Sequence, residues 1–82
     1  MRVWISKQDI SMATPREPTM CPIARALGRK ARPTDYVSVG TTTASVGKTH
    51  YRLSKAASAF VNKFDGGYRV KPCYVYMAEA DI

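Results

Sequence analysis

The segment Ser54–Gly67, SKAASAFVNKFDGG, decides the fold because it contains both ends of an amphipathic helix. Ser54 is a good N-cap, and the glycines that follow Asp65 end the helix because glycine readily adopts the left-handed backbone conformation. The spacing of apolar residues predicts a helix from Lys55 to Phe64 that packs on a core. Its apolar stripe consists of Ala57, Phe60, Val61 and Phe64.

Three short stretches before this helix have the alternating, β-branched pattern of strands. They run from Tyr36 to Val39, from Thr43 to Val46 and from Thr49 to Leu53, with Gly40 and Gly47-Lys48 at the joints. A glycine-containing joint of two residues is typical of a tight hairpin turn. We therefore expect a three-strand meander, or a long hairpin with a bulge.

The two ends of the chain predict one strand each. Arg2 to Ile5 and Val70 to Ala78 both alternate with a period of two. Pro72 cannot donate a ladder hydrogen bond, so we expect the start of the last strand at a sheet edge. The aromatic residues that this alternation places away from the core are Trp4, Tyr74 and Tyr76.

A second helix is predicted from Pro22 to Ala31, because proline suits the first helical turn and Pro33 prevents continuation. Ser6 and Asp9 have the spacing of a capping box, which indicates a short helical turn from Lys7 to Ser11. The element order β-α-β-β-(β)-α-β predicts a single small α+β domain over residues 1–82, with two helices packed on one face of a small, mainly antiparallel sheet.

Length and charge limit the functions open to this domain. The 82 residues include 13 Lys and Arg against 6 Asp and Glu, which gives a net charge of +7. A chain this short has no room for a catalytic domain beside a binding domain, and its positive charge favours polyanions or acidic protein surfaces. No stretch approaches the roughly 18 apolar residues that span a bilayer, so we expect a cytosolic protein without membrane contact.

The basic residues are the strongest functional signal. Arg25, Arg29 and Arg32 recur at i, i+4 and i+7 and so line one outer stripe of the predicted helix. Such a stripe neutralises phosphates, although a solvated face that keeps a small protein soluble is the alternative interpretation. The predicted nucleic-acid or partner-binding residues are Arg25, Arg29, Lys30, Arg32, Lys48 and Arg52.

Catalytic motifs are weak. Thr42–Thr49 ends like a phosphate-binding loop, but it has threonine where that motif requires glycine, and a strand follows instead of a helix. Cys21 at a helix start is more typical of a buried cap than of a nucleophile served by His50. One histidine and two cysteines are too few for a structural zinc site. We expect a protein that is not an enzyme and uses no metal or cofactor.

Several short motifs resemble a family of small, uncharacterised accessory proteins of tailed bacteriophages. They are Cys21-Pro22-Ile23-Ala24 at a helix start and Phe64-Asp65-Gly66-Gly67 followed by Val70-Lys71-Pro72. The resemblance covers most of the chain, but that family has no established activity and assigns no functional residues. The segment Met12–Met20 departs from it, with prolines and an arginine where glycine is expected. The resemblance implies an accessory or host-interaction role in the cytoplasm of the bacterial host.

Two functions fit these features. The first is stoichiometric, non-enzymatic binding of nucleic acid or a nucleotide ligand through the basic face, with Trp4, Tyr74 and Tyr76 as stacking surfaces. The second is inhibition of a host nucleic-acid-handling or defence complex, in which the basic face occupies an acidic protein surface and the rings cover the partner. A homodimer formed through the sheet edge near Pro72 is a further alternative.

Overall fold

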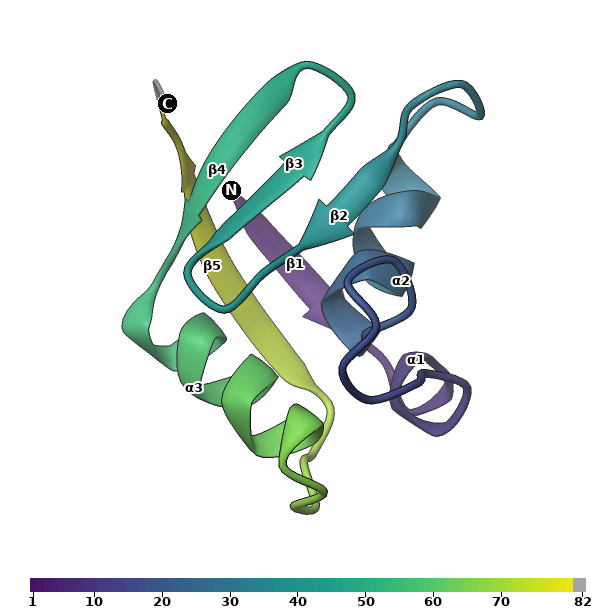
Figure 1. Ribbon diagram of the computed structural model, residues 1–82, viewed down its shortest axis with the longest axis vertical. Coiled ribbons are helices and arrows are strands. Elements are labelled where there is room, and N and C mark those ends of the chain that lie inside the picture. The colour runs from purple at the N-terminus through teal and green to yellow at the C-terminus, as the bar shows by residue number, and fades with distance from the viewer. Residues whose placement is uncertain (81–82) are drawn as a thin grey trace.

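The first and last strands of the chain pair side by side and are part of a five-stranded antiparallel sheet with the order β1-β5-β4-β3-β2 (Figure 1). The computed structural model describes residues 1–80. The strands are β1 (Arg2–Ile5), β2 (Val37–Val39), β3 (Thr43–Val46), β4 (Thr49–Leu53) and β5 (Cys73–Glu79). The helices are α1 (Lys7–Ser11), α2 (Pro22–Lys30) and α3 (Lys55–Asp65).

The α+β class is confirmed, and so are most element bounds. β3 and β4 have the predicted bounds, and α3 extends one residue beyond its predicted end. The largest difference is β5, which begins at Cys73 instead of Val70. Pro72 lies immediately before it, and a proline cannot donate the hydrogen bond that would extend the ladder backwards.

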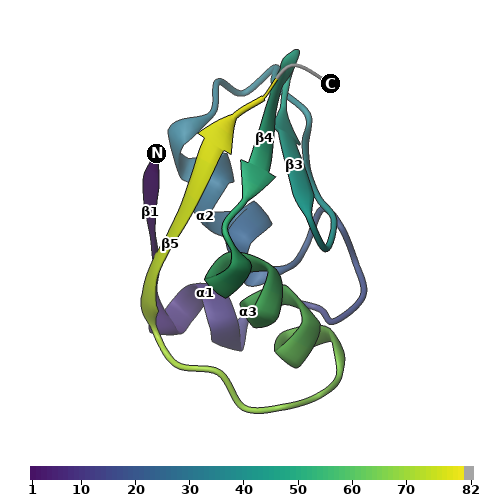
Figure 2. The ribbon, with the colours of Figure 1, turned by 90° about the vertical axis from the view of Figure 1, so that its left-hand side faces the viewer.

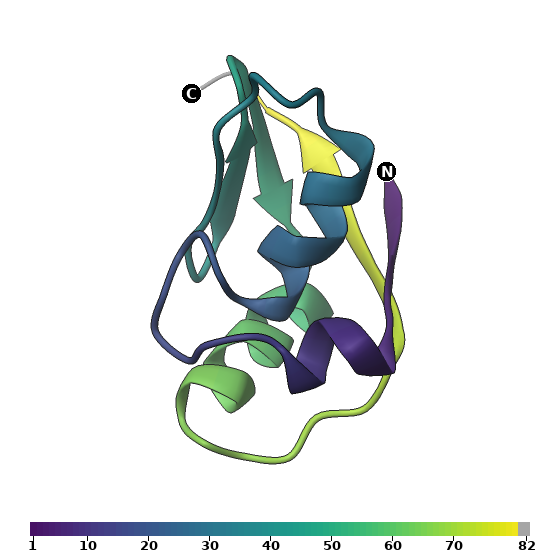
Figure 3. The same ribbon diagram turned by 90° about the vertical axis from the view of Figure 1, so that its right-hand side faces the viewer.

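Helix α2 bridges the two edges of the sheet, because it packs against both β1 and β2 (Figure 3). Its N-terminus begins as predicted, with Pro22 in the first turn and Cys21 as N-cap. Helix α3 packs instead against β4 and β5. The prediction that two helices share one face is therefore met in part: both bury their apolar stripes in the same core, but at different places along a curled sheet.

One continuous core lies between the sheet and these two helices. Each strand contributes alternate residues, as a period of two requires. All four residues of the predicted α3 stripe are buried. The largest fully buried hydrophobic side chains are Val3, Ile5, Ile23, Leu27 and Val75.

The two halves of β5 pair with different strands. Cys73–Tyr76 pairs with β1, whereas Met77–Glu79 pairs with β4. The first half of β5 therefore has a ladder on one side only, which agrees with the edge predicted from Pro72.

The outer face of the sheet carries no helix over its centre. Figure 2 looks onto this face, where β5 and β4 lie in front of α2. Side chains that alternate with the core residues of β1, β4 and β5 point this way and are exposed. No helix in residues 1–80 has the length and hydrophobicity needed to cross a bilayer.

Candidate nucleic-acid interface

A buried carboxylate engages two of the six predicted binding residues. Ser6 and Asp9 form the predicted capping box at the start of α1: the Ser6 amide donates to Asp9 Oδ2 at 2.9 Å, and the Asp9 amide donates to Ser6 Oγ at 3.0 Å. Arg29 on α2 donates a hydrogen bond from Nη1 to Asp9 Oδ1. Arg25, one turn earlier, has its Nε 3.9 Å from the same oxygen. Arg25 and Arg29 thus tie α1 to α2.

The electrostatics of Asp9 agree with this structural role. Its side chain is 1% exposed, and burial alone would raise the pKa of the carboxyl group. The hydrogen bonds from Arg29 and Ser6, together with the charge of Arg29, outweigh burial and hold the pKa of Asp9 below its ordinary value. The carboxylate therefore stays ionised at neutral pH and offsets much of the positive charge of this part of α2.

Arg29 and Lys30 also contact the free edge of β1. Arg29 Nη2 donates to the Trp4 carbonyl oxygen at 3.2 Å, and Lys30 Nζ donates to the Arg2 carbonyl oxygen at 3.4 Å. These carbonyls have no strand beyond them, because β1 is the first strand in the sheet order. The two cations replace the missing neighbour.

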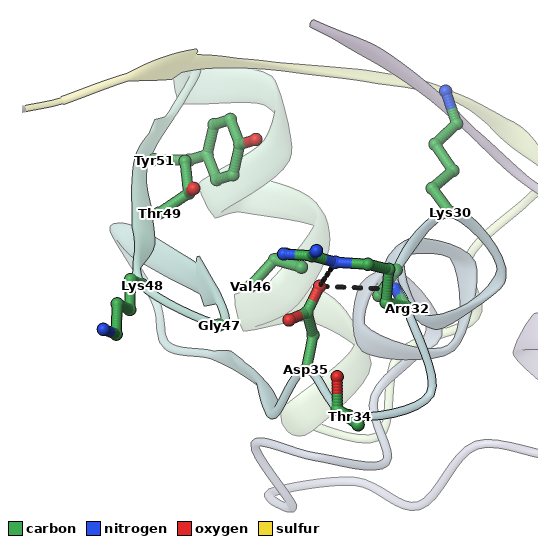
Figure 4. Close-up of a pocket in the computed structure, with 10 residues that line it drawn as sticks. Lys30, Arg32, Thr34, Asp35, Val46, Gly47, Lys48, Thr49 and Tyr51 are labelled. Carbon is green, nitrogen blue, oxygen red and sulfur yellow. Dashed lines mark hydrogen bonds and ion pairs between the residues drawn. The ribbon is translucent and has the colours of Figure 1, made fainter.

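Three of the predicted residues surround one hollow (Figure 4). Lys30 and Arg32 lie at the end of α2 and in the loop after it, and Lys48 lies in the turn between β3 and β4. The guanidinium of Arg32 lies across the hollow, with Nε 3.7 Å from Asp35 Oδ2. We name this site the basic hollow; its volume is about 620 Å³, and it is lined by Lys30, Ala31, Arg32, Thr34, Asp35, Val46, Gly47, Lys48, Thr49 and Tyr51.

Arg52 lies apart from the basic hollow, on the outer face of the sheet. Its partner across the ladder is Ala78, and Tyr76 lies on the same face two residues earlier in β5. Arg52 and Tyr76 share the lining of a second hollow of about 340 Å³, at the point where β4 ends.

The exposed aromatic residues gather on this same face. Trp4 and Tyr74 are ladder partners on β1 and β5, with ring centroids 4.9 Å apart and planes tilted by 58°. The guanidinium carbon of Arg2 lies 4.3 Å from the centre of the Tyr74 ring, and Arg2 pairs across the ladder with Tyr76. Trp4, Tyr74 and Tyr76 are 45%, 47% and 53% exposed. We call Trp4, Tyr74, Tyr76, Arg2 and Arg52 the aromatic face.

Sequence alternation anticipated the three rings, because each alternates with buried residues of its strand. Arg2 was missed as a binding residue, although the same alternation places it on the face of Trp4. Asp9 was missed as the partner of two arginines, because no local pattern connects α1 with α2.

Of the two residues weighed for catalysis, Cys21 has a structural role. Cys21 Sγ accepts a hydrogen bond from the Ala24 amide at 3.4 Å and so caps α2, while burial raises the pKa of its thiol. His50 is an exposed residue of β4. Among residues 1–80, no three His, Cys, Asp or Glu side chains are placed to hold a metal ion.

The outer face of the curled sheet is therefore uncovered at its centre, aromatic and cationic. Neither a known protein family, nor a curated protein, nor a solved structure matches this chain. The resemblance to phage accessory proteins stays a prediction.

Proposed function

We propose that this protein binds single-stranded nucleic acid through the aromatic face, without catalysing a reaction. The observation that supports this function is the cluster of three half-exposed rings with two arginines on a sheet face that no helix covers. Rings of this kind stack on unpaired bases, and each stacked base contributes about 1–3 kcal/mol.

Charge supports a polyanionic ligand. The chain carries a net charge of +7, and Arg2 and Arg52 flank Tyr76 on either side, from β1 and β4. A strand whose bases stack on the rings would bring its phosphates within reach of these guanidinium groups. Lys48 and Arg32 lie apart from this face and add only to the overall positive charge of the protein. Arg25 and Arg29 contribute less, because Asp9 faces them.

The chain carries its own reporter for this function. It contains one tryptophan, and that residue, Trp4, lies in the aromatic face. Titration with a thymidine dodecamer at low salt is expected to quench the tryptophan fluorescence, with an affinity that falls as salt is raised. A duplex of the same length should quench less, because its bases are already stacked.

A matched pair of variants locates the site. Tyr76→Ala is expected to weaken dodecamer binding about 5- to 150-fold, which corresponds to about 1–3 kcal/mol for one stacked base. Tyr68→Ala is the control, because Tyr68 is an exposed tyrosine in the loop between α3 and β5, away from the aromatic face. Equal effects of the two substitutions would contradict the assignment.

An exposed aromatic patch with arginines is also the composition of a protein-binding hot spot. If the dodecamer causes no quenching at low salt, and capture from nuclease-treated bacterial lysate retains one protein whose binding requires Tyr76, the single-strand proposal is wrong. The protein then acts as an inhibitor of a host nucleic-acid-handling or defence complex. In either case we propose the cytoplasm of the bacterial host as the place of action, which is what the resemblance to phage proteins implies.

A further inference from the structure

The basic hollow lies apart from the aromatic face and has the features of a small-ligand site. Its volume of about 620 Å³ falls within the range of about 300–1,000 Å³ that small-molecule sites occupy. It lies between the loop after α2 and the tip of the β3–β4 hairpin (Figure 4).

The lining combines an apolar floor with a cationic rim. Val46 and Tyr51 come from β3 and β4, on the core side of the sheet, and are only partly buried. The Arg32 guanidinium contributes positive charge across the hollow, whereas Lys48 lies on the opposite side with its ammonium group directed outward. Thr34 and Thr49 add hydroxyl groups that can hydrogen-bond a polar ligand; the complete lining is given above.

Asp35 contacts both the backbone and the side chain of Arg32. Asp35 Oδ2 accepts a hydrogen bond from the Arg32 amide at 3.3 Å and lies 3.7 Å from its Nε. The ion pair involves only Nε of the guanidinium, and the Arg32 side chain is still 84% exposed. Gly47 gives Asp35 room, because a Cβ atom at position 47 would lie 2.8 Å from Asp35 Oδ1. The absence of a side chain at Gly47 therefore leaves space for the Asp35 carboxylate, which in turn pairs with the Arg32 guanidinium.

We propose that the basic hollow binds a nucleoside phosphate. The base lies against the Tyr51 ring and Val46, and Asp35 accepts a hydrogen bond from a sugar hydroxyl or an exocyclic amine. The phosphate is bound by Arg32 and by Lys48, whose exposed side chain is directed outward in the free protein and turns inward to reach the ligand. Lys30 acts through its charge alone, because its Nζ is directed to the Arg2 carbonyl at the β1 edge. The ligand is either a free nucleotide or the phosphorylated end of a strand, since both present the same chemical group.

Isothermal titration calorimetry of the full chain with AMP, ADP and ATP tests this site. Binding with a dissociation constant below about 1 mM supports it. A 5′-phosphorylated tetranucleotide distinguishes the two sources: binding of the tetranucleotide that leaves the Trp4 fluorescence unchanged, with no binding of AMP, assigns the site to strand ends. Inorganic triphosphate lacks the base, so its binding as tightly as ATP would overturn the proposal, as would the absence of any binding.

Variants of equal charge locate the ligand. Arg32→Ala and Lys48→Ala should each weaken ATP binding about tenfold, whereas Lys63→Ala removes the same charge from the exposed side of α3 and should leave it unchanged. Equal weakening by all three variants would overturn the site, because it would show only nonspecific attraction. Binding in the basic hollow should leave the Trp4 fluorescence unchanged, so failure here and failure of the single-strand function give different readouts.

Discussion

Replacement of Arg29 by alanine tests whether this arginine stabilises the fold or binds nucleic acid. The substitution removes the hydrogen bond to the buried Asp9 carboxylate and the bond of 3.2 Å to the Trp4 carbonyl. A hydrogen bond to a charged group contributes about 1.5–3 kcal/mol and a neutral one about 0.5–1.5 kcal/mol. Because the Arg29 side chain is 51% exposed, water replaces part of these hydrogen bonds. We therefore expect the free energy of unfolding to fall by about 2 kcal/mol.

Thermal unfolding followed by circular dichroism measures this loss. In a domain of this size, about 2 kcal/mol lowers the melting temperature by about 8–16 °C. Arg32→Ala is the control, because it removes the same charge from a surface ion pair and should change stability by at most about 0.5 kcal/mol. If Arg29→Ala melts with the parent protein and instead loses dodecamer affinity, the structural interpretation of Arg29 is refuted.

The remaining predictions concern pH, the core and the hairpin turn. The pKa of Asp9 is lowered in the folded protein, so its contribution to stability is complete above its unfolded pKa and is lost as pH falls through the folded pKa. The difference in the free energy of unfolding between the parent protein and Arg29→Ala, measured by urea titration, should therefore narrow below about pH 4. Leu27→Ala, at a fully buried position, should cost about 2–5 kcal/mol in the same titrations, and a loss below about 1 kcal/mol would show that the face of α2 is misassigned. Gly47→Ala should cost about 1–3 kcal/mol, because the residue has φ +60° and its new Cβ would meet Asp35; a neutral effect in urea unfolding would contradict the close contact with Asp35.

Local signals were enough to predict most elements of this fold. Ser54 caps α3 by accepting from the Ala57 amide at 3.1 Å, and Gly47 supplies the positive φ of the β3–β4 turn. Both effects act within a few residues along the chain, so the sequence pattern contains them. The curling of the sheet is different, because it depends on α2 packing against both β1 and β2.

The candidate site likewise contains residues that local sequence patterns predicted and residues that they did not. Tyr74 and Tyr76 were predicted on an exposed face because they alternate with buried residues of a single strand. The partner of Arg29 was not predictable, because Asp9 lies 20 residues away and becomes buried only when α1 docks beside α2. The helical periodicity correctly predicted that Arg25 and Arg29 face away from the sheet core. It contained no information about α1, whose Asp9 pairs with both of them.

The hydrogen bonds that cover the two outer strands of the sheet also affect the tendency to aggregate. Arg29 and Lys30 hydrogen-bond the outer carbonyls of β1, and on the opposite edge the Val39 amide of β2 donates to the Pro18 carbonyl at 2.9 Å. A strand edge left without such partners is a template on which another chain adds its own strand. The β1 edge depends on α2 and the β2 edge on the loop before α2, so a partly unfolded state that releases α2 before the strands separate would expose β1 and be competent for aggregation.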